Sequence, residues 1–267
     1  MQIPLYQIDA FTAHPFGGNP AAVCPLERWL DDGTMQAIAA ENNLSETAFF
    51  VPQGDDFHLR WFTPVREVDL CGHATLASAY VIFTRLAPTR QRVRFMSRFG
   101  LLEVTREADR LVLDFPAVST DVLDDAGAAA KALGRAPGEL WRGDPAKLGI
   151  TMAVFANAGE VKALTPDLAL VAALPSDGII ATAPGDPGTN VDFVSRYFAP
   201  AAGIPEDPVT GAIHCLLIPF WAKRLGKSRI FARQVSRRGG ELWCEERGTR
   251  VGIGGRCVGV MEGAIAI

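Results

Sequence analysis

The sequence predicts an α+β fold made of two homologous halves, each a curled β-sheet around one apolar helix. Short alternating strand patterns recur along the 267 residues, and two apolar helical segments stand among them, at 76–83 and 214–225. The order of the elements also repeats, so that each apolar helix falls at the same place in its half. These two observations together predict a duplicated architecture.

Three pairs of segments carry the repeat. They are Ser45-Glu46-Thr47 with Ser176-Asp177-Gly178, Arg60-Trp61-Phe62-Thr63-Pro64 with Arg196-Tyr197-Phe198-Ala199-Pro200, and Cys71-Gly72 with Thr210-Gly211. Aligning position 46 with 177, 62 with 198 and 72 with 211 gives offsets of 131, 136 and 139 residues, so short insertions separate the halves. The predicted domains are 1–116, to which a last strand at about 258–267 can return, and 117–257.

The elements follow from alternation, caps and turn residues. In the first half we expect strands at 5–11, 21–24, 48–51, 57–62, 93–95, 101–105 and 110–115, and a helix from Asp31 or Asp32 to about Asn42. In the second half we expect a helix and a connection at 121–141, strands at 151–155, 179–182 and 191–198, a helix at 167–174, and a β-meander from 231 onward. The apolar helices complete each half.

Composition excludes several classes of protein. A formal charge of −4 and a pI near 5.6 give no reason to expect nucleic acid or an anionic membrane as a partner. The longest apolar run, 215–222, is too short to span a bilayer and contains Pro219. No signal peptide is visible, and five cysteines at scattered positions form neither a disulfide framework nor a zinc pattern. A cytoplasmic protein with reduced thiols is the simplest interpretation.

Differences between the halves indicate where chemistry resides. A duplicated scaffold needs its shared features for folding, so residues special to one half are candidates for function. This argument selects Glu46, His73 and Asp207, together with Asn19 in the first Gly- and Pro-rich loop. A carboxyl among apolar neighbours suits general acid/base chemistry, and a helix start suits a bound carboxylate. We expect the two apolar helices to begin at a shared cleft, where the imidazole of His73 tends toward neutrality.

Each of these residues also has a purely structural explanation. Glu46 can be a turn acid, and His73 a core histidine that bonds a backbone carbonyl. Asp207 followed by Pro208 can be a helix cap, although this does not explain the adjacent Glu206. Asn19 suits an ordinary turn. No dinucleotide fingerprint, P-loop, nucleophile elbow or clustered metal ligands appear in the sequence.

Several motifs in order resemble the phenazine-biosynthesis PhzF-like family, within the diaminopimelate-epimerase-like superfamily. They are Ile8-Asp9-Ala10-Phe11, Gly18-Asn19-Pro20-Ala21-Ala22-Val23, Asn43-Leu44-Ser45-Glu46-Thr47-Ala48-Phe49, Phe62-Thr63-Pro64, Cys71-Gly72-His73-Ala74-Thr75 and Glu206-Asp207-Pro208-Val209-Thr210-Gly211. The resemblance covers nearly the whole chain. It implies two pseudo-symmetric domains, each a barrel-like mixed β-sheet wrapped around a central helix, and assembly as a homodimer.

The resemblance also implies an isomerase that uses neither cofactor nor metal and moves a proton on a small carboxylate-bearing substrate. The family's acid/base glutamate maps to Glu46, and its substrate-contacting histidine and aspartate map to His73 and Asp207. The further substrate-binding positions are Asn19, Ser45, Gly72, Thr210, Gly211 and Ala212, with backbone donors at Gly72 and at Gly211-Ala212 holding the carboxylate.

Two departures keep alternatives open. The family commonly has Ser-Ala after its Thr-Gly pair, where this chain has Ala212-Ile213 and so lacks a hydroxyl. The superfamily's epimerases use one cysteine from each half, but Thr210 stands opposite Cys71, which disfavours that route. The alternatives are a racemase or epimerase with Glu46 or Cys71 as a single base, and a non-catalytic binding protein on the same fold.

Overall fold

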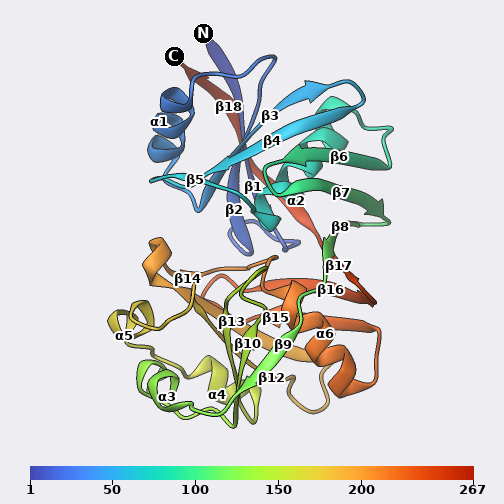
Figure 1. Cartoon of the computed structure of the whole chain (residues 1–267). Coiled ribbons are helices and arrows are strands. Elements are labelled where there is room, and N and C mark those ends of the chain that lie inside the picture. Colours follow the sequence, from blue (N-terminus) through green and yellow to red (C-terminus); the bar gives the residue numbers. More distant parts are fainter. The chain divides into compact units, whose positions relative to one another are not determined.

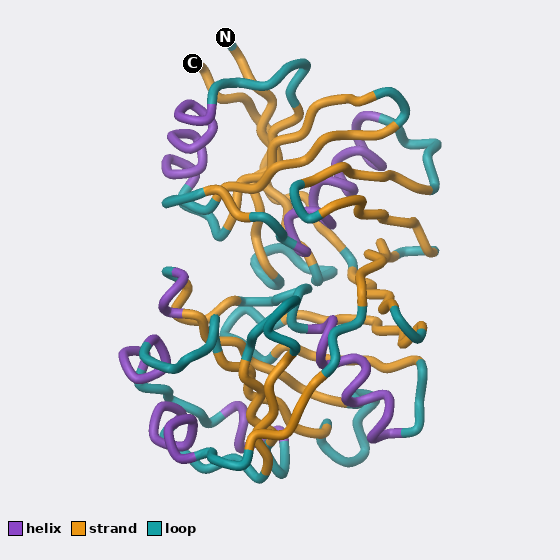
Figure 2. Tube along the Cα trace, in the orientation of Figure 1, coloured by secondary structure: helices purple, strands orange, loops and turns teal.

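The structure is a computed structural model that describes residues 1–267 and divides them into two compact units. Unit 1 comprises Met1–Phe115 and Ile253–Ile267, and unit 2 comprises Pro116–Gly252. Both units contain more strand than helix (Figure 2). The predicted α+β class is therefore confirmed.

Unit 1 contains both chain ends, which lie side by side because the first and last strands pair (Figure 1). Its strands are β1 (Gln2–Ala10), β2 (Asn19–Pro25), β3 (Glu46–Gln53), β4 (Asp56–Phe62), β5 (Glu67–Val68), β6 (Arg92–Ser97), β7 (Gly100–Glu107), β8 (Arg110–Pro116) and β18 (Cys257–Ala266). Its helices are α1 (Asp32–Asn42) and α2 (Gly72–Val81), the latter continued by a π-turn at Ile82–Leu86. Strand β8 runs one residue into unit 2.

Unit 2 has the same kind of composition. Its strands are β9 (Thr120–Leu123), β10 (Glu139–Gly143), β11 (Thr151–Val154), β12 (Ile179–Pro184), β13 (Phe193–Ala199), β14 (Ile204–Asp207), β15 (Arg229–Gln234), β16 (Gly240–Arg247) and β17 (Arg250–Gly255), whose last three residues belong to unit 1. Its helices are α3 (Gly127–Leu133), α4 (Ala158–Lys162), α5 (Leu168–Ala172) and α6 (His214–Leu225), with a 3₁₀ turn at Pro200–Ala202.

Strand pairing shows the internal repeat directly. In unit 1 the pairs β1–β2, β3–β4 and β6–β7 are antiparallel, whereas β2–β3 and β4–β6 are parallel. In unit 2 the pairs β10–β11, β12–β13 and β15–β16 are antiparallel, whereas β11–β12 and β13–β15 are parallel. Strand β18 adds to β1 as β9 adds to β10. The same pairing order in both units confirms the internal repeat that the sequence predicted.

Each unit is built around one apolar helix. Helix α2 buries every residue except Tyr80 and packs against β1, β2, β3 and β18. Helix α6, which has the predicted bounds, packs against β15 and β16 and continues through Pro219. A proline has no N–H for the carbonyl four residues before it. The backbone N–H of Val118 donates to that carbonyl, of Cys215, at 2.9 Å, so the apolar helix loses no buried hydrogen bond.

One sequence expectation was wrong in detail. The segment 121–141, expected to be one helix and a connection, contains β9 and β10 on either side of α3. Both strands are short, four and five residues, so alternation alone did not reveal them. Their counterparts in unit 1 are β18 and β1, which the chain supplies from its two ends.

None of the helices is long and apolar enough to span a membrane. All five cysteines are free thiols, and four of them are buried.

Candidate active-site residues in the two units

Three segment starts meet in unit 1. Parallel pairing of β2 and β3 puts their first residues at the same edge, with Ala21 opposite Glu46. Gly18, which precedes β2, has a φ of +60°, and a Cβ there would lie 2.1 Å from the carbonyl oxygen of Ala10. Only glycine fits this turn, and the turn places Asn19 at the edge where β2 and β3 begin. Helix α2 begins there as well, because His73 contacts both Asn19 and Glu46.

The residues of this edge form one buried polar cluster. The Nε2 atom of His73 lies 3.1 Å from Oε2 of Glu46, and its Nδ1 atom faces the side-chain amide of Asn19 at 3.2 Å. Cys71 brings its sulfur to 3.5 Å from the same Nδ1, and Ser45 donates its hydroxyl to Oδ1 of Asn19 at 3.2 Å. Glu46 is only 7% exposed and His73 only 4%. Four sequence candidates of unit 1 thus lie together, and Gly72 stands between Cys71 and His73.

The contact between Glu46 and His73 is an ion pair without the alignment of a hydrogen bond. Although Oε2 and Nε2 are 3.1 Å apart, neither atom has a hydrogen-bonding partner. Buried polar atoms are nearly always satisfied, and an exception calls for an explanation such as a catalytic role or a bound group. These two atoms are therefore available to a bound molecule.

His73 differs from its predicted charge state. Burial lowers the pKa of His73, but Cys71 and Glu46 raise it by more, so it stands well above the usual 6.5. Burial also raises the pKa of the Cys71 thiol to about 11, so Cys71 keeps its proton at neutral pH. The carboxylate of Glu46 is then the charge that favours the imidazolium. The expectation of a neutral imidazole was wrong, because a facing carboxylate outweighs the effect of a helix start.

We expect replacement of Glu46 by Gln to lower the pKa of His73 toward or below its usual value, since burial then acts without an opposing charge. In the parent protein, the raised pKa of His73 means that its ion pair with Glu46 stabilises the fold fully below pH 6.5. This contribution is lost as the pH rises through the pKa of His73 in the folded state. An NMR titration of the His73 ring in both proteins measures the change. An unchanged ring titration would show that Glu46 does not set the charge of His73.

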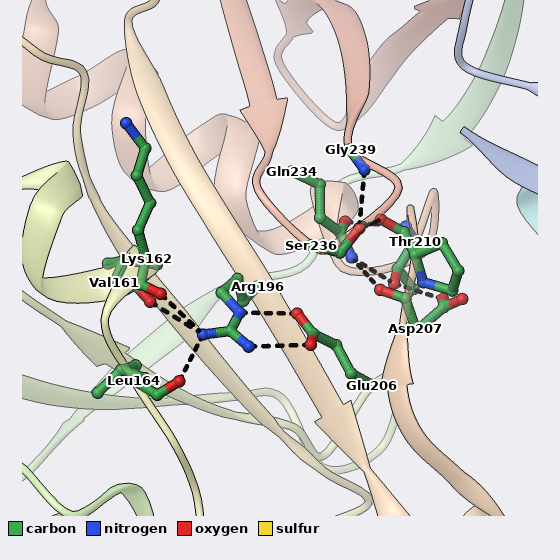
Figure 3. A network of polar contacts seen from close by, with 11 residues as sticks. Val161, Lys162, Leu164, Arg196, Glu206, Asp207, Thr210, Gln234, Ser236 and Gly239 are labelled. Atoms are coloured by element: carbon green, nitrogen blue, oxygen red, sulfur yellow. Dashed lines mark hydrogen bonds and ion pairs between the residues drawn. The ribbon is translucent and has the colours of Figure 1, made fainter. Parts of the chain in front are cut away.

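The candidates of unit 2 are organised by a residue that the sequence analysis missed, Gln234 (Figure 3). Its Nε2 donates to the backbone oxygen of Asp207 at 2.8 Å and to Oγ1 of Thr210 at 3.2 Å, and its Oε1 accepts from the backbone N–H of Thr210 at 2.9 Å. Thr210 in turn donates its hydroxyl to Oδ2 of Asp207 at 2.5 Å. Gln234 is the last residue of β15, on its buried face with Ile230 and Ala232, so a polar residue in a buried register was the signal.

Figure 3 also shows residues that hold the segment from Glu206 to Thr210 through further polar contacts. Ser236 donates its hydroxyl to the oxygen of Pro208 at 2.8 Å. Arg196 binds both carboxylate oxygens of Glu206, at 2.7 and 2.9 Å, which answers why an acid precedes Asp207. The equivalent pair in unit 1, Arg60 with Glu67, has the same two-bond geometry at 2.7 and 2.8 Å. The arginine–glutamate clamp is therefore a shared structural feature and Asp207 is special to unit 2.

The register corrects one correspondence of the repeat. Phe62 pairs with Thr47, and its counterpart Phe198 pairs with Ile179, so the position of Glu46 corresponds to Gly178 rather than to Asp177. A Cβ at Gly178 would lie 2.7 Å from the oxygen of Phe198 and from the ring of Tyr197. Unit 2 thus has no side chain at the place of Glu46. The difference between the halves is larger than the sequence alignment indicated.

The correspondence between Cys71 and Thr210, at the starts of the two apolar helices, is confirmed. Thr75 donates its hydroxyl to the oxygen of Cys71, and His214, 139 positions later, uses its Nδ1 on the oxygen of Thr210 at 2.8 Å. Cys71 and Thr210 are therefore equivalent, as are His73 and Ala212. Neither α2 nor α6 has a side-chain cap at its start, so their first backbone N–H groups, which include those of Gly72 and of the Gly211-Ala212 turn, have no such acceptor.

His214 gives unit 2 an acid-sensitive position. It is fully buried, its Nε2 has no partner, and burial lowers its pKa to about 4. The unfolded chain, with a histidine pKa near 6.5, binds the proton first, so stability falls as the pH drops from about 6.5 toward about 4, by up to about 3 kcal/mol. We expect His214→Asn, which keeps a donor for the Thr210 oxygen, to lose less stability between pH 7 and 4.5 than the parent. Urea unfolding at both pH values measures this, and equal losses would contradict it.

The comparisons with known proteins agree with the fold. Residues 8–263 match the family model described as phenazine biosynthesis-like protein. Over its whole length the chain is 49% identical to an uncharacterized isomerase of Pseudomonas aeruginosa, and it is 41% identical to the human phenazine biosynthesis-like domain-containing protein, with 99% of each chain covered.

Solved structures give the same result. A PhzF-family protein of Enterococcus faecalis superposes with a TM-score of 0.94 at 44% identity, over 100% of both chains. A hydroxyproline epimerase from Agrobacterium vitis, with trans-4-hydroxy-L-proline bound, shares the fold at a TM-score of 0.64 and 12% identity, over 99% of this chain and 91% of that one. The predicted family and the epimerase-like fold are both confirmed. This chain belongs to the phenazine biosynthesis-like (PhzC-PhzF) family.

Proposed function

We propose that this protein is an isomerase that moves a proton on a small carboxylate-bearing substrate, with Glu46 as the proton carrier. The observation that carries the proposal is the buried pair of Glu46 and His73, whose facing atoms lie 3.1 Å apart without other partners. A carboxylate held against an imidazolium in a water-poor site can take a proton from a carbon acid and return it at another position. The relatives named isomerases support the reaction class.

In this proposal His73 stabilises the charge that develops on the substrate. When Glu46 removes a proton, negative charge spreads onto the substrate carboxylate or an adjoining unsaturated carbon. The imidazolium is already in place as a fixed positive charge, which favours that state over the neutral substrate. Asn19, anchored by Ser45, keeps the ring in one orientation. In this proposal the base and the electrophile come from the same edge of unit 1.

The substrate carboxylate is assigned to the uncapped helix starts. Backbone N–H groups at Gly72 in unit 1 and at Gly211-Ala212 in unit 2 suit an anion, and neither helix start has a side-chain acceptor. Within unit 2, Asp207 and Thr210, which Gln234 fixes, are the proposed substrate-binding residues, as the family resemblance implies. Ala212 offers only its backbone, so the substrate is expected to lack the group that a serine hydroxyl would bind.

A single-base racemase or epimerase is the second candidate, favoured by the Cys71 sulfur at 3.5 Å from His73. Both candidates can be tested together by incubating a defined library of small carboxylic and amino acids with the protein in D₂O. A product with a moved double bond or hydrogen supports the isomerase. Deuterium at a stereocentre of an otherwise unchanged acid supports the epimerase, and the absence of both from every library member would favour a binding protein.

The proposal includes a cytoplasmic homodimer, as the family resemblance implies. Free thiols at all five cysteines suit a reducing compartment. Light scattering during size exclusion gives the mass in solution, and a value of one chain, 28.7 kDa, would contradict the dimer.

A further inference from the structure

Unit 2 has a groove near the end of α6, away from the candidate residues at the start of that helix. The groove lies between the start of β9 with the two residues before it, Trp141 of β10, and the last two turns of α6, and its volume is about 510 Å³. His214 and Lys223 are nine positions apart in α6, which is about 14 Å along a helix axis. Because pockets for small molecules have volumes of about 300–1,000 Å³, this groove has room for one.

Aromatic rings and a cation form the wall of this groove on the side of α6 and β10. Trp141 meets Phe220 edge to face, with ring centroids 5.4 Å apart and an interplanar angle of 71°. The guanidinium of Arg224 lies 4.6 Å from the centre of the Phe220 ring. Glu139 fixes this arrangement, because it accepts hydrogen bonds from Arg224 at 2.8 Å and from the indole N–H of Trp141 at 2.9 Å. A flat ring can therefore pack against aromatic side chains that are already held in place.

The charges around the groove favour an anion. No acidic residue lines it, and the carboxylate of Glu139 neutralises Arg224. The ammonium of Lys223, by contrast, has no ion pair and no hydrogen bond within the protein, and the hydroxyls of Ser119 and Thr120 donate none either. A carboxylate in the groove thus meets one uncompensated positive charge and two free hydroxyl donors.

The equivalent place in unit 1 lacks these features. The offset of 139 residues pairs three wall positions of the two apolar helices: Tyr80 with Pro219, Thr84 with Lys223 and Arg85 with Arg224. The cavity between α2, β1 and β18 is smaller, about 200 Å³, and its one cation, Arg85, donates to Glu262 at 3.1 Å. The hydroxyl of Thr84 is used within the helix, on the oxygen of Tyr80 at 2.7 Å. The larger volume and the unpaired lysine are therefore special to unit 2.

We propose that this groove of unit 2 binds a small aromatic carboxylate, with the ring against Trp141 and Phe220 and the carboxylate at Lys223. The site is separate from the proposed proton carrier, so its binding does not rest on the proposed function. A second copy of the chain is the competing occupant. Lysine is depleted in interfaces between protein chains, which favours the small ligand.

Isothermal titration calorimetry of the full-length protein with 2-naphthoate tests the site. We expect one site per chain, weakened about tenfold or more in Lys223→Gln, because a hydrogen bond to a charged group is lost. Affinity should be unchanged in Lys147→Gln, a matched change at another exposed lysine of unit 2. The uncharged 2-naphthamide and the non-aromatic cyclohexanecarboxylate should each bind about tenfold more weakly or less tightly still.

NMR locates the bound ring. The indole N–H signal of Trp141, assigned by its loss in Trp141→Phe, should shift as 2-naphthoate is added. Equal affinity in the parent and in Lys223→Gln, or no binding of 2-naphthoate at all, would overturn the site. Binding that leaves the Trp141 signal in place would put the carboxylate elsewhere, such as at the uncapped helix starts, and would overturn it as well. A changed mass in solution for Lys223→Gln would instead make the groove a contact between copies of the chain.

Discussion

Replacing Glu46 by Gln should reduce turnover by about 10²- to 10⁴-fold, the range that a positioned general acid or base contributes. Glutamine keeps the size and the polar contact of the side chain but cannot accept and return a proton. The fold should survive, because Glu46 lies at the first residue of β3 and its neighbours remain in place. The rate of product formation or of deuterium incorporation, on the first substrate found in the carboxylate library, measures the loss.

A matched control separates chemistry from folding. Glu41, an exposed residue of α1, can be changed to Gln without disturbing the buried cluster, and this variant should keep full activity. Full turnover in Glu46→Gln, on a substrate that the parent converts, would show that another group carries the proton. Cys71 would then become the leading base, since it is the remaining acid/base group in contact with His73.

The two histidines at corresponding helix starts show why similar sequence positions behave differently. His73 faces a carboxylate and has a raised pKa, whereas His214 faces a backbone oxygen and the ring of Phe193, and its pKa is lowered to about 4. Burial disfavours the charge of both rings, so the neighbouring side chain decides the sign. That neighbour comes from another strand, and the local sequence therefore could not reveal the charge of His73.

The repeat was visible in the sequence because its clamps are local motifs. Arg60 and Arg196 each start a similar three-residue motif near the end of a strand, and each binds a glutamate a few residues later in the chain. In unit 2 the apolar helix that follows, α6, ends at the predicted residue. A one-residue difference before β12 was not visible, because Asp177 is chemically more like Glu46 than Gly178 is. Only the strand register shows that Gly178, and not Asp177, corresponds to Glu46.

The role of Gln234 could not be assigned from sequence for a related reason. It is far along the chain from the Asp207–Thr210 turn, and its three hydrogen bonds to that turn exist only after β15 has paired with β13. Motifs next to a site predict its first contacts, whereas the residues that fix those contacts come from strands brought together by folding.

Replacing Arg196 by Ala should destabilise the protein by about 3 kcal/mol, near the lower end of the cost of breaking a buried ion pair. Arg196 is 12% exposed and binds Glu206 through two bonds. Its third nitrogen donates to the backbone oxygens of Val161 and Leu164, at 3.2 and 2.8 Å (Figure 3). Truncation to alanine leaves these backbone acceptors and the carboxylate of Glu206 without the partner that Arg196 provides. It also removes the guanidinium that lies 4.8 Å above the ring of Phe198.

The equivalent arginine of unit 1 provides the comparison for this prediction. Arg60→Ala should cost less, about 1–2 kcal/mol, because Glu67 keeps a second partner in Arg98 at 2.9 Å and Asp32 is exposed to water. Urea unfolding of both variants, followed by circular dichroism at one pH, measures the difference. Equal losses would mean that the backbone acceptors of Arg196 find water when the side chain is removed. A larger loss for Arg196→Ala would establish that unit 2 relies on its clamp to hold α4 against β13 and, through Glu206, to fix the strand that ends at Asp207.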